Sequence, residues 1–192
     1  MSKKNNNIDD MAFKIMAIGS SDSGKNEIIK KLISVKFDAK SISTVGFGTF
    51  NKEIKLRNGY AMKLNIIDTT VIENFKSLWI SYIKNADGFL FIFSHNDKTS
   101  FDDIKRWLVN IKKEFPNIDF KNIKPAFLVG NYSNLEHEID KDEIEELRSE
   151  YNFCGYIDIN SNDNDDYSIN LLFSEIGEIF LKRYGKRRTK QK

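Results

Sequence analysis

The sequence predicts an α/β domain: a mostly parallel six-stranded sheet with one antiparallel edge strand and helices on both faces. Three observations predict this fold. Short apolar segments alternate with segments whose apolar residues recur at helical spacing. Two of the apolar segments, 88–94 and 126–130, are uninterrupted, as in strands buried on both faces. A glycine-containing loop at 19–24 joins the first expected strand to the first expected helix.

The elements are expected in the following chain order. A strand at 13–18 and a helix at 27–35 come first, and Asn58-Gly59 then joins strands 47–56 and 61–67 as a hairpin. A helix at 76–84 precedes the strand at 88–94. Ser100 and Asp103 form a capping box that opens a helix through residue 115. The strand at 126–130 is followed by a helix at 142–151, a strand at 156–159 and a closing helix at 169–184.

The composition indicates one soluble globular domain. The chain has 192 residues, of which 40% are hydrophobic and 30% charged, and a net charge of +2 gives no field that would favour nucleic acid. One cysteine, Cys154, excludes an internal disulfide framework, and its apolar neighbours favour a buried thiol. His95 and His137 are far apart in sequence, so we expect no metal site on them. Residues 1–11 are predicted to be disordered, 12–184 to form the domain and 185–192 to be a basic tail.

The loop that follows the first strand has the composition of a phosphate-binding loop. Gly19, Gly24 and Lys25 have the spacing Gly-x-x-x-x-Gly-Lys, directly after an apolar strand and before a helix. The glycines let backbone N–H groups surround phosphate oxygens, and the lysine reaches the terminal phosphates. The next residue, Asn26, stands where the motif requires the magnesium-binding hydroxyl of Ser or Thr. An alternative is a relic loop that binds nothing.

Further segments carry a family resemblance. The first is Ser43-Thr-Val-Gly46, in which Thr44 lies 18 residues after Asn26 (44 − 26 = 18). The others, in chain order, are Ile66-Ile-Asp-Thr69, Ala86-Asp-Gly88, Thr99 to Trp107 and Leu128-Val-Gly-Asn131. With these segments the chain resembles a Ras-superfamily small GTPase, most like the Rab branch, from about residue 13 to 182. The resemblance implies a guanine nucleotide, GDP or GTP, with Mg²⁺ as its companion ion.

The resemblance also implies the site residues. Asn26, Thr44 and Asp68 would hold the metal ion, and Phe37 would lie against the purine, although an ordinary core position for Phe37 stays open. The nucleotide-binding set is Gly19, Ser20, Ser21, Asp22, Ser23, Gly24, Lys25, Asn26, Phe37, Thr44, Asn131, Tyr132, Asn134, Asn160, Ser161 and Asn162.

Several of these positions depart from the family pattern in ways that weaken the chemistry. Ser21 and Asp22 replace glycines beside the γ-phosphate, and Asn26 is a poor match to compact octahedral magnesium. Val71 replaces the switch II glycine, and Ile72 stands at the position of the water-orienting glutamine, whose hydrogen bonds it cannot make. No catalytic residue is therefore intact. We expect weak Mg²⁺ binding, a preference for GDP, and GTP hydrolysis that is very slow or absent.

The base-recognition motif is also altered. Asn131 is retained, Tyr132 replaces a lysine stem that would lie across the base, and Asn134 replaces the aspartate that accepts two hydrogen bonds from guanine. An amide offers one acceptor group and one donor group, so one of the two contacts is lost. Residues 160–162 keep only a small residue, Ser161, at their centre. We therefore expect relaxed base specificity.

The remaining expectations concern partners and location. No cysteine follows Cys154, so no prenyl anchor is expected, and the basic tail gives at most weak membrane contact. We expect a cytoplasmic monomer whose contact with membranes is at most peripheral. We expect it to act in vesicle trafficking by binding a regulator or effector protein through its switch surfaces. One alternative is a nucleotide-free pseudo-GTPase scaffold. A second is a slow working GTPase that uses a partner's catalytic residue.

Overall fold

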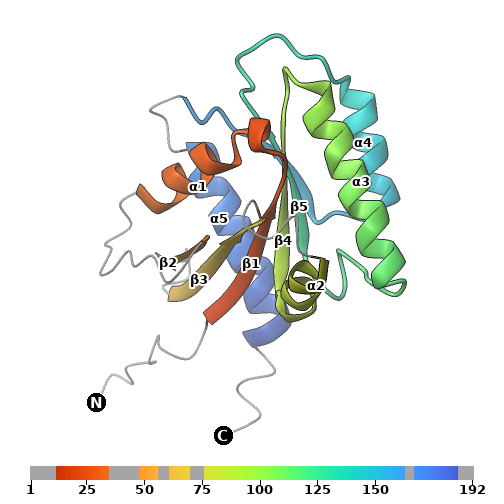
Figure 1. The fold of residues 1–192 in the computed structure, drawn as a ribbon. Coiled ribbons are helices and arrows are strands. Elements are labelled where there is room, and N and C mark those ends of the chain that lie inside the picture. The colour runs from red at the N-terminus through yellow and green to blue at the C-terminus, as the bar shows by residue number, and fades with distance from the viewer. Residues whose placement is uncertain (1–11, 35–47, 56–60, 70–75, 163–166, 186–192) are drawn as a thin grey trace, which may run out of the picture.

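A six-stranded sheet in the order β2-β3-β1-β4-β5-β6 forms the centre of the computed structural model. The structure describes residues 12–34, 48–55, 61–69, 76–162 and 167–185 (Figure 1). All neighbouring strands pair in parallel except β2 and β3, which are antiparallel. The strands are β1 (Ala12–Ile18), β2 (Thr49–Lys55), β3 (Ala61–Asp68), β4 (Gly88–Ser94), β5 (Ala126–Asn131) and β6 (Gly155–Asp158). The predicted fold class, with its antiparallel edge strand, is confirmed.

The helices cover both faces of this sheet, as Figure 1 shows. One hydrophobic core joins α1 and α5 to the sheet, and the other joins α2, α3 and α4 to its opposite face. Side chains of β1 alternate between the two cores, since Phe13 and Ile15 belong to the first and Met16 to the second. The helices are α1 (Lys25–Ser34), α2 (Lys76–Asn85), α3 (Lys98–Glu114), α4 (Lys141–Glu150) and α5 (Tyr167–Phe180).

The start of α3 differs from the prediction. The helix begins at Lys98, and the N-cap is Asp97, whose carboxylate accepts a hydrogen bond of 2.9 Å from the N–H of Thr99. The predicted capping box at Ser100 is therefore wrong. Ser100 is buried within the first turn, where its hydroxyl accepts from the N–H of Ser94 at 2.8 Å. Ser100 thus holds the end of β4 against α3.

Other boundaries differ by a few residues. The first turn of α1 includes Lys25 and Asn26, so the helix begins two residues before the expected position. The closing helix α5 begins at Tyr167 and continues after Phe180 as a π-helical turn, Leu181–Gly185. Cys154 is half-buried against the first core, and burial raises the pKa of its thiol, as expected for an unreactive cysteine. The predicted Asn58-Gly59 turn lies outside the described residues, as do residues 1–11 and 186–192.

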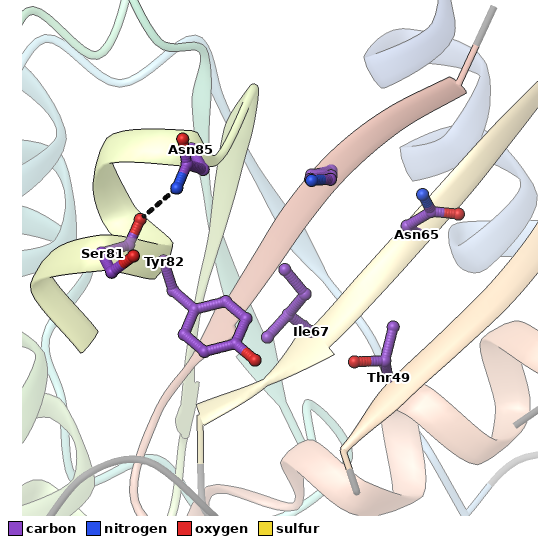
Figure 2. A pocket seen from close by; sticks show the side chains of 7 residues that line it. Thr49, Asn65, Ile67, Ser81, Tyr82 and Asn85 are labelled. Atoms are coloured by element: carbon purple, nitrogen blue, oxygen red, sulfur yellow. Dashed lines mark hydrogen bonds between the residues drawn. The ribbon is translucent and has the colours of Figure 1, made fainter. Parts of the chain in front are cut away.

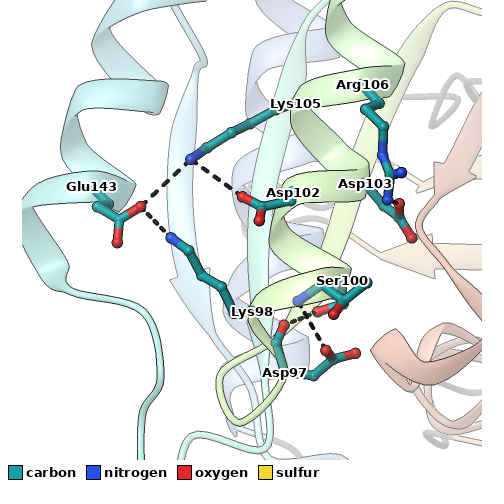
Figure 3. A network of polar contacts seen from close by, with 9 residues as sticks. Asp97, Lys98, Ser100, Asp102, Asp103, Lys105, Arg106 and Glu143 are labelled. Carbon is teal, nitrogen blue, oxygen red and sulfur yellow. Dashed lines mark hydrogen bonds and ion pairs between the residues drawn. The ribbon is translucent and has the colours of Figure 1, made fainter.

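Ion pairs join α3 to α4 on the side of the sheet away from α1. Glu143 of α4 accepts hydrogen bonds from Lys98 and Lys105 of α3, the latter over 3.5 Å (Figure 3). Lys105 also lies 3.5 Å from Asp102 on its own helix. The hydrogen bond from Lys98 is the main reason that the pKa of Glu143 lies below its ordinary value. Within the described ranges, no helix is both long and apolar enough to cross a bilayer.

Candidate functional site

The predicted nucleotide-binding loops meet at one edge of the sheet. The loop 19–24 follows β1, residues 131–134 begin at the end of β5, and residues 160–162 follow β6. These strands are parallel, so their carboxyl ends and the loops after them lie at the same edge. Ligands of open α/β sheets bind outside this edge. The fold thus brings the loop 19–24 together with two segments that begin more than a hundred residues after it (131 − 24 = 107).

The phosphate loop is a short turn fixed by internal hydrogen bonds. Residues Ser21–Ser23 form one 3-10 turn, and the hydroxyl of Ser23 donates to the carbonyl of Ser20 at 2.8 Å. Gly24 has φ 71° and its carbonyl accepts from the N–H of Ile28 at 3.0 Å, which starts α1. A Cβ on Gly19 would lie 2.3 Å from the carbonyl oxygen of Ile92, so the loop contacts β4 directly. Both motif glycines are required by their surroundings.

Lys25 and Asp68 form a buried ion pair between this loop and the end of β3. Lys25 Nζ lies 2.5 Å from Asp68 Oδ1, and the two side chains are 1% and 9% exposed. Neighbouring Thr69 is fully buried and donates its hydroxyl hydrogen to the carbonyl of Ala17 at 3.0 Å. The ammonium group predicted to hold phosphate is therefore already neutralised by the carboxylate predicted to hold magnesium.

Asn131 connects all three loops. Its side-chain Nδ2 donates to the carbonyls of Ser23 and Gly24 at 3.2 and 3.4 Å. Its Oδ1 accepts from the N–H of Ser161 at 3.1 Å and from the N–H of Tyr132 at 2.8 Å. The residue is fully buried. Both polar atoms of one amide are thus used to hold the phosphate loop and the 160–162 loop together.

Tyr132 lies over the phosphate loop. Its hydroxyl oxygen is 2.7 Å from the point that a Cβ on Gly24 would occupy, and Asn131 Nδ2 is 2.1 Å from the same point. Tyr132 has φ 55°, the left-handed region that non-glycine residues seldom adopt. The ring is half-buried. The absence of a side chain at Gly24 therefore lets both Asn131 and Tyr132 approach the loop.

The residues that would hold Mg²⁺ fit it poorly. Asn26 is exposed on the first turn of α1, Asp68 is engaged by Lys25, and Thr44 lies outside the described residues. In the described part of the chain, no three or more His, Cys, Asp or Glu side chains gather in a way that could hold a metal ion. A divalent ion at Asp68 would have to displace or share with the ammonium group of Lys25.

The side of the site predicted to contact the base is more open. Asn134 and Asn162 are exposed, and Asn160 is half-buried with its Oδ1 accepting from the N–H of Asn162 at 3.1 Å. Two hydroxyl oxygens in these loops, Ser20 Oγ and Ser161 Oγ, are buried and have no hydrogen-bond partner among the described residues. Such atoms suit a polar ligand that would supply the missing bonds. Ser21 and Asp22 are exposed.

Sequence reasoning missed some residues that shape the site. Lys31 of α1 donates to the carbonyl of Asn160 at 3.2 Å, which ties the helix to the 160–162 loop. A solvated helical lysine has no distinguishing sequence signal. His95 and His137, which are far apart in sequence, have stacked rings with centroids 3.9 Å apart. Phe37, Thr44, Val71 and Ile72 lie outside the described residues.

Comparison with known proteins agrees with this architecture. The model of the Ras family matches residues 14–181. A probable Rab-related GTPase of Acanthamoeba polyphaga mimivirus is 28% identical over 85% of this chain and 74% of its own length. Ras-related protein Rab-5B of Plasmodium falciparum is 36% identical over 57% of this chain and 53% of its own length. Ras-related protein SEC4 of Saccharomyces cerevisiae is 27% identical over 91% of this chain and 77% of its own length. The chain belongs to the Ras family of small GTPases and, within it, to the Rab branch.

Proposed function

We propose that the chain is a divergent Rab-like G protein that binds guanine nucleotide weakly, prefers GDP to GTP, depends little on Mg²⁺ and hydrolyses GTP very slowly or not at all. It acts as a regulatory module in vesicle trafficking by presenting the surface around its switch segments to a partner protein. The observation that carries the binding half of this proposal is the fourfold bonding of Asn131, which holds the phosphate loop and the 160–162 loop together.

The ion pair between Lys25 and Asp68 supports weak, metal-poor binding. A phosphate group must share the ammonium of Lys25 with a carboxylate 2.5 Å away. The carboxylate also offsets part of the positive charge of the ammonium group, so the attraction of Lys25 for the phosphate is weaker. The exposed amide of Asn26 stands in place of the missing Ser or Thr ligand. The affinity for nucleotide should therefore be low, and the gain from added Mg²⁺ should be small.

The departures at the γ-phosphate positions support the preference for GDP. Asp22 places a carboxylate in the turn that would face the terminal phosphates, and Val71 and Ile72 replace the glycine and glutamine that serve the γ-phosphate in the family. A diphosphate avoids these positions. The exposed position of Asn134 and the contact of Tyr132 with Gly24 support relaxed recognition of the base.

The partner-binding half of the proposal is supported by the surface between α2 and the β2–β3 hairpin. A cavity of about 320 Å³ lies there, and in Figure 2 the Tyr82 ring points from α2 toward Ile67. Tyr82 and Leu78 of α2 are 37% and 46% exposed. The cavity is lined by Lys14, Thr49, Asn65, Ile67, Ser81, Tyr82 and Asn85. The hydroxyl and amide groups with one cationic side chain suit a polar or acidic side chain of a partner.

The experiment that tests the proposal is mass spectrometry of the nucleotide released on denaturing freshly purified protein. We expect a substoichiometric amount of nucleotide, with GDP in excess over GTP. Lys25→Ala should release none, whereas the exposed control Lys30→Ala on the same helix should release as much as the unaltered chain. Stoichiometric GTP would contradict the proposal.

A second candidate is a nucleotide-free pseudo-GTPase scaffold. The observation that favours it is again the buried pair, because a lysine neutralised by Asp68 needs no phosphate to satisfy its charge. Absence of any released nucleotide, together with no binding of added GDP, would favour this candidate.

A further inference from the structure

One peptide group in the loop 160–162 is held from both sides. The carbonyl of Asn160 accepts a hydrogen bond of 3.2 Å from Lys31 Nζ of α1. The N–H of Ser161, which belongs to the same peptide group, donates to Asn131 Oδ1 at 3.1 Å. A peptide group is planar, so bonds at its oxygen and at its hydrogen fix the orientation of the whole plane. The side chains of Lys31 and Asn131 together are called the peptide clamp below.

Both members of the peptide clamp also connect to the phosphate loop. Asn131 Nδ2 donates to two carbonyls of that loop at 3.2 and 3.4 Å. Lys31 lies six residues after Lys25 in the same helix (31 − 25 = 6), which is about 9 Å along the helix axis. Helix α1 therefore contributes Lys25 at the phosphate end of the candidate site and Lys31 at the end predicted to contact the base.

The backbone N–H groups of the loop are engaged within the protein. At its start, the N–H of Ile159 donates to the carbonyl of Gly130 at 2.7 Å. At its end, the N–H of Asn162 donates to Asn160 Oδ1 at 3.1 Å. The N–H of Ser161 is bound by the peptide clamp. The group of Ser161 that remains to bind a ligand is therefore its hydroxyl.

The hydroxyl of Ser161 differs from those of the fully buried serines. Its Oγ is buried and has no hydrogen-bond partner in the described part of the chain. By contrast, the hydroxyls of the fully buried Ser23, Ser94 and Ser100 all donate to oxygen atoms of the protein. A buried hydroxyl without a partner costs free energy. A ligand that supplies the missing hydrogen bond accounts for such a group in a candidate site.

Resting on the nucleotide binding proposed above, we propose that Lys31 is a positioning residue for the nucleotide. With Asn131 it fixes the peptide group before Ser161, and this holds the Ser161 hydroxyl where it forms a hydrogen bond with the polar edge of the base. A hydroxyl donates or accepts and rotates to suit its partner, so it serves a carbonyl as well as an amine. The contact thus does not depend on Asn134.

Lys31→Met tests the peptide clamp, because methionine keeps an unbranched side chain but has no donor. The affinity for labelled GDP should fall by about three- to tenfold, the effect of one hydrogen bond. Lys31→Arg keeps a cationic donor and should stay within about twofold of the unaltered chain. Lys30→Met removes the same charge from an exposed position of the same helix and should leave the affinity unchanged. Equal losses in Lys30→Met and Lys31→Met would contradict the proposal, because they would show an effect of net charge.

A double-mutant cycle separates positioning from a general structural role. Ser161→Ala alone should lower the affinity for GDP by about three- to tenfold, because it removes the hydroxyl. In the double variant Lys31→Met/Ser161→Ala, the Lys31 change should add less than about a further twofold, since no hydroxyl remains to be positioned. Losses that multiply in full would show that Lys31 acts independently of Ser161 and would overturn the proposal.

A measurement without nucleotide separates this inference from the proposed function. NMR follows the exchange of the Ser161 amide hydrogen with solvent. In Lys31→Met this hydrogen should exchange at least about tenfold faster than in the unaltered chain or in Lys30→Met. An unaltered exchange rate in Lys31→Met would refute the inference even if GDP binds. Faster exchange in a chain that binds no GDP would refute the proposed function, whereas the peptide clamp itself would hold.

Discussion

Lys25 Nζ lies 2.5 Å from Asp68 Oδ1, and both side chains are buried at the edge of the sheet where the predicted phosphate and metal positions meet. In a low-dielectric environment such a pair is strong only while both partners are present. The family resemblance assigns Lys25 to the phosphate and Asp68 to Mg²⁺, but in this structure the two side chains bind each other.

This pair predicts a stability effect. Lys25→Ala deprives the Asp68 carboxylate of its ammonium partner, so the free energy of unfolding should fall by about 3–5 kcal/mol in urea titrations. The double variant Lys25→Ala/Asp68→Ala should lose less than the sum of the two single losses, because the two side chains interact directly. Lys30→Ala, exposed on the same helix, should change stability by no more than about 0.5 kcal/mol. Strict additivity of the two single losses would show that the pair contributes nothing.

The contact between α3 and α4 predicts a small dependence of stability on acid. The hydrogen bond from Lys98 holds the pKa of Glu143 below its ordinary 4.5. The folded state therefore binds fewer protons here than the unfolded state, so this stabilisation is present above pH 4.5 and is lost as the pH falls through the folded pKa.

Glu143→Gln should accordingly lower stability at pH 7 by about 0.2–1 kcal/mol, the range for exposed pairs, and by less at pH 3. Urea midpoints of the variant and of Glu146→Gln, an exposed change on the same helix, give the comparison. Equal losses at both pH values would show that the Glu143 carboxylate is not stabilised in this way.

Hydrolysis should be at or below the intrinsic rate of an ordinary small GTPase, because Ile72 cannot orient water. Single-turnover phosphate release measures it. Ile72→Gln alone should raise the rate of GTP hydrolysis little, because Ser21 and Val71 still stand where the family has glycines. Release as fast as that of a glutamine-bearing relative would refute the prediction, and rapid release only with a partner protein present would favour catalysis in trans.

Base preference should be relaxed or shifted toward xanthine. Asn134 can accept from the ring N–H of the base and donate to the xanthine carbonyl that replaces the exocyclic amine of guanine. The binding free energies of XDP and GDP should differ by about 1–3 kcal/mol, because one hydrogen bond to Asn134 is matched with xanthine and mismatched with guanine. Competition of labelled GDP by XDP and by ADP measures it, and Asn134→Asp should restore the preference for GDP. A hundredfold advantage of GDP over XDP in the unaltered chain would mean that Asn134 does not face the base.

Much of the fold could be predicted because its signals are local. β4 has the predicted bounds, Gly88–Ser94, since an uninterrupted apolar run between polar residues has one plausible strand assignment. The start of α3 could not be decided locally, because Asp97 and Ser100 both have side chains that cap helices and tertiary packing buries Ser100.

In the candidate site, a residue marked by a motif could likewise be predicted from the sequence, whereas contacts between distant residues could not. Asn131 was predicted to belong to the site because a motif marks it, and it donates to the carbonyls of Ser23 and Gly24 and accepts from the N–H of Ser161. The direct pairing of Lys25 with Asp68 and the stacking of His95 on His137 join residues about forty positions apart. No spacing rule links such residues, so only the strand order brings them together.

The affinity for GDP with and without a magnesium chelator tests the central claim most directly. Titration of labelled GDP should give weak binding that changes by no more than about tenfold on chelation. Asn26→Ser should raise both the magnesium dependence and the affinity for GTP, because a hydroxyl suits the compact ion better than an amide. A loss of several orders of magnitude on chelation in the unaltered chain would contradict the account, since Asp68 and Asn26 would then coordinate the ion despite the Lys25 ion pair.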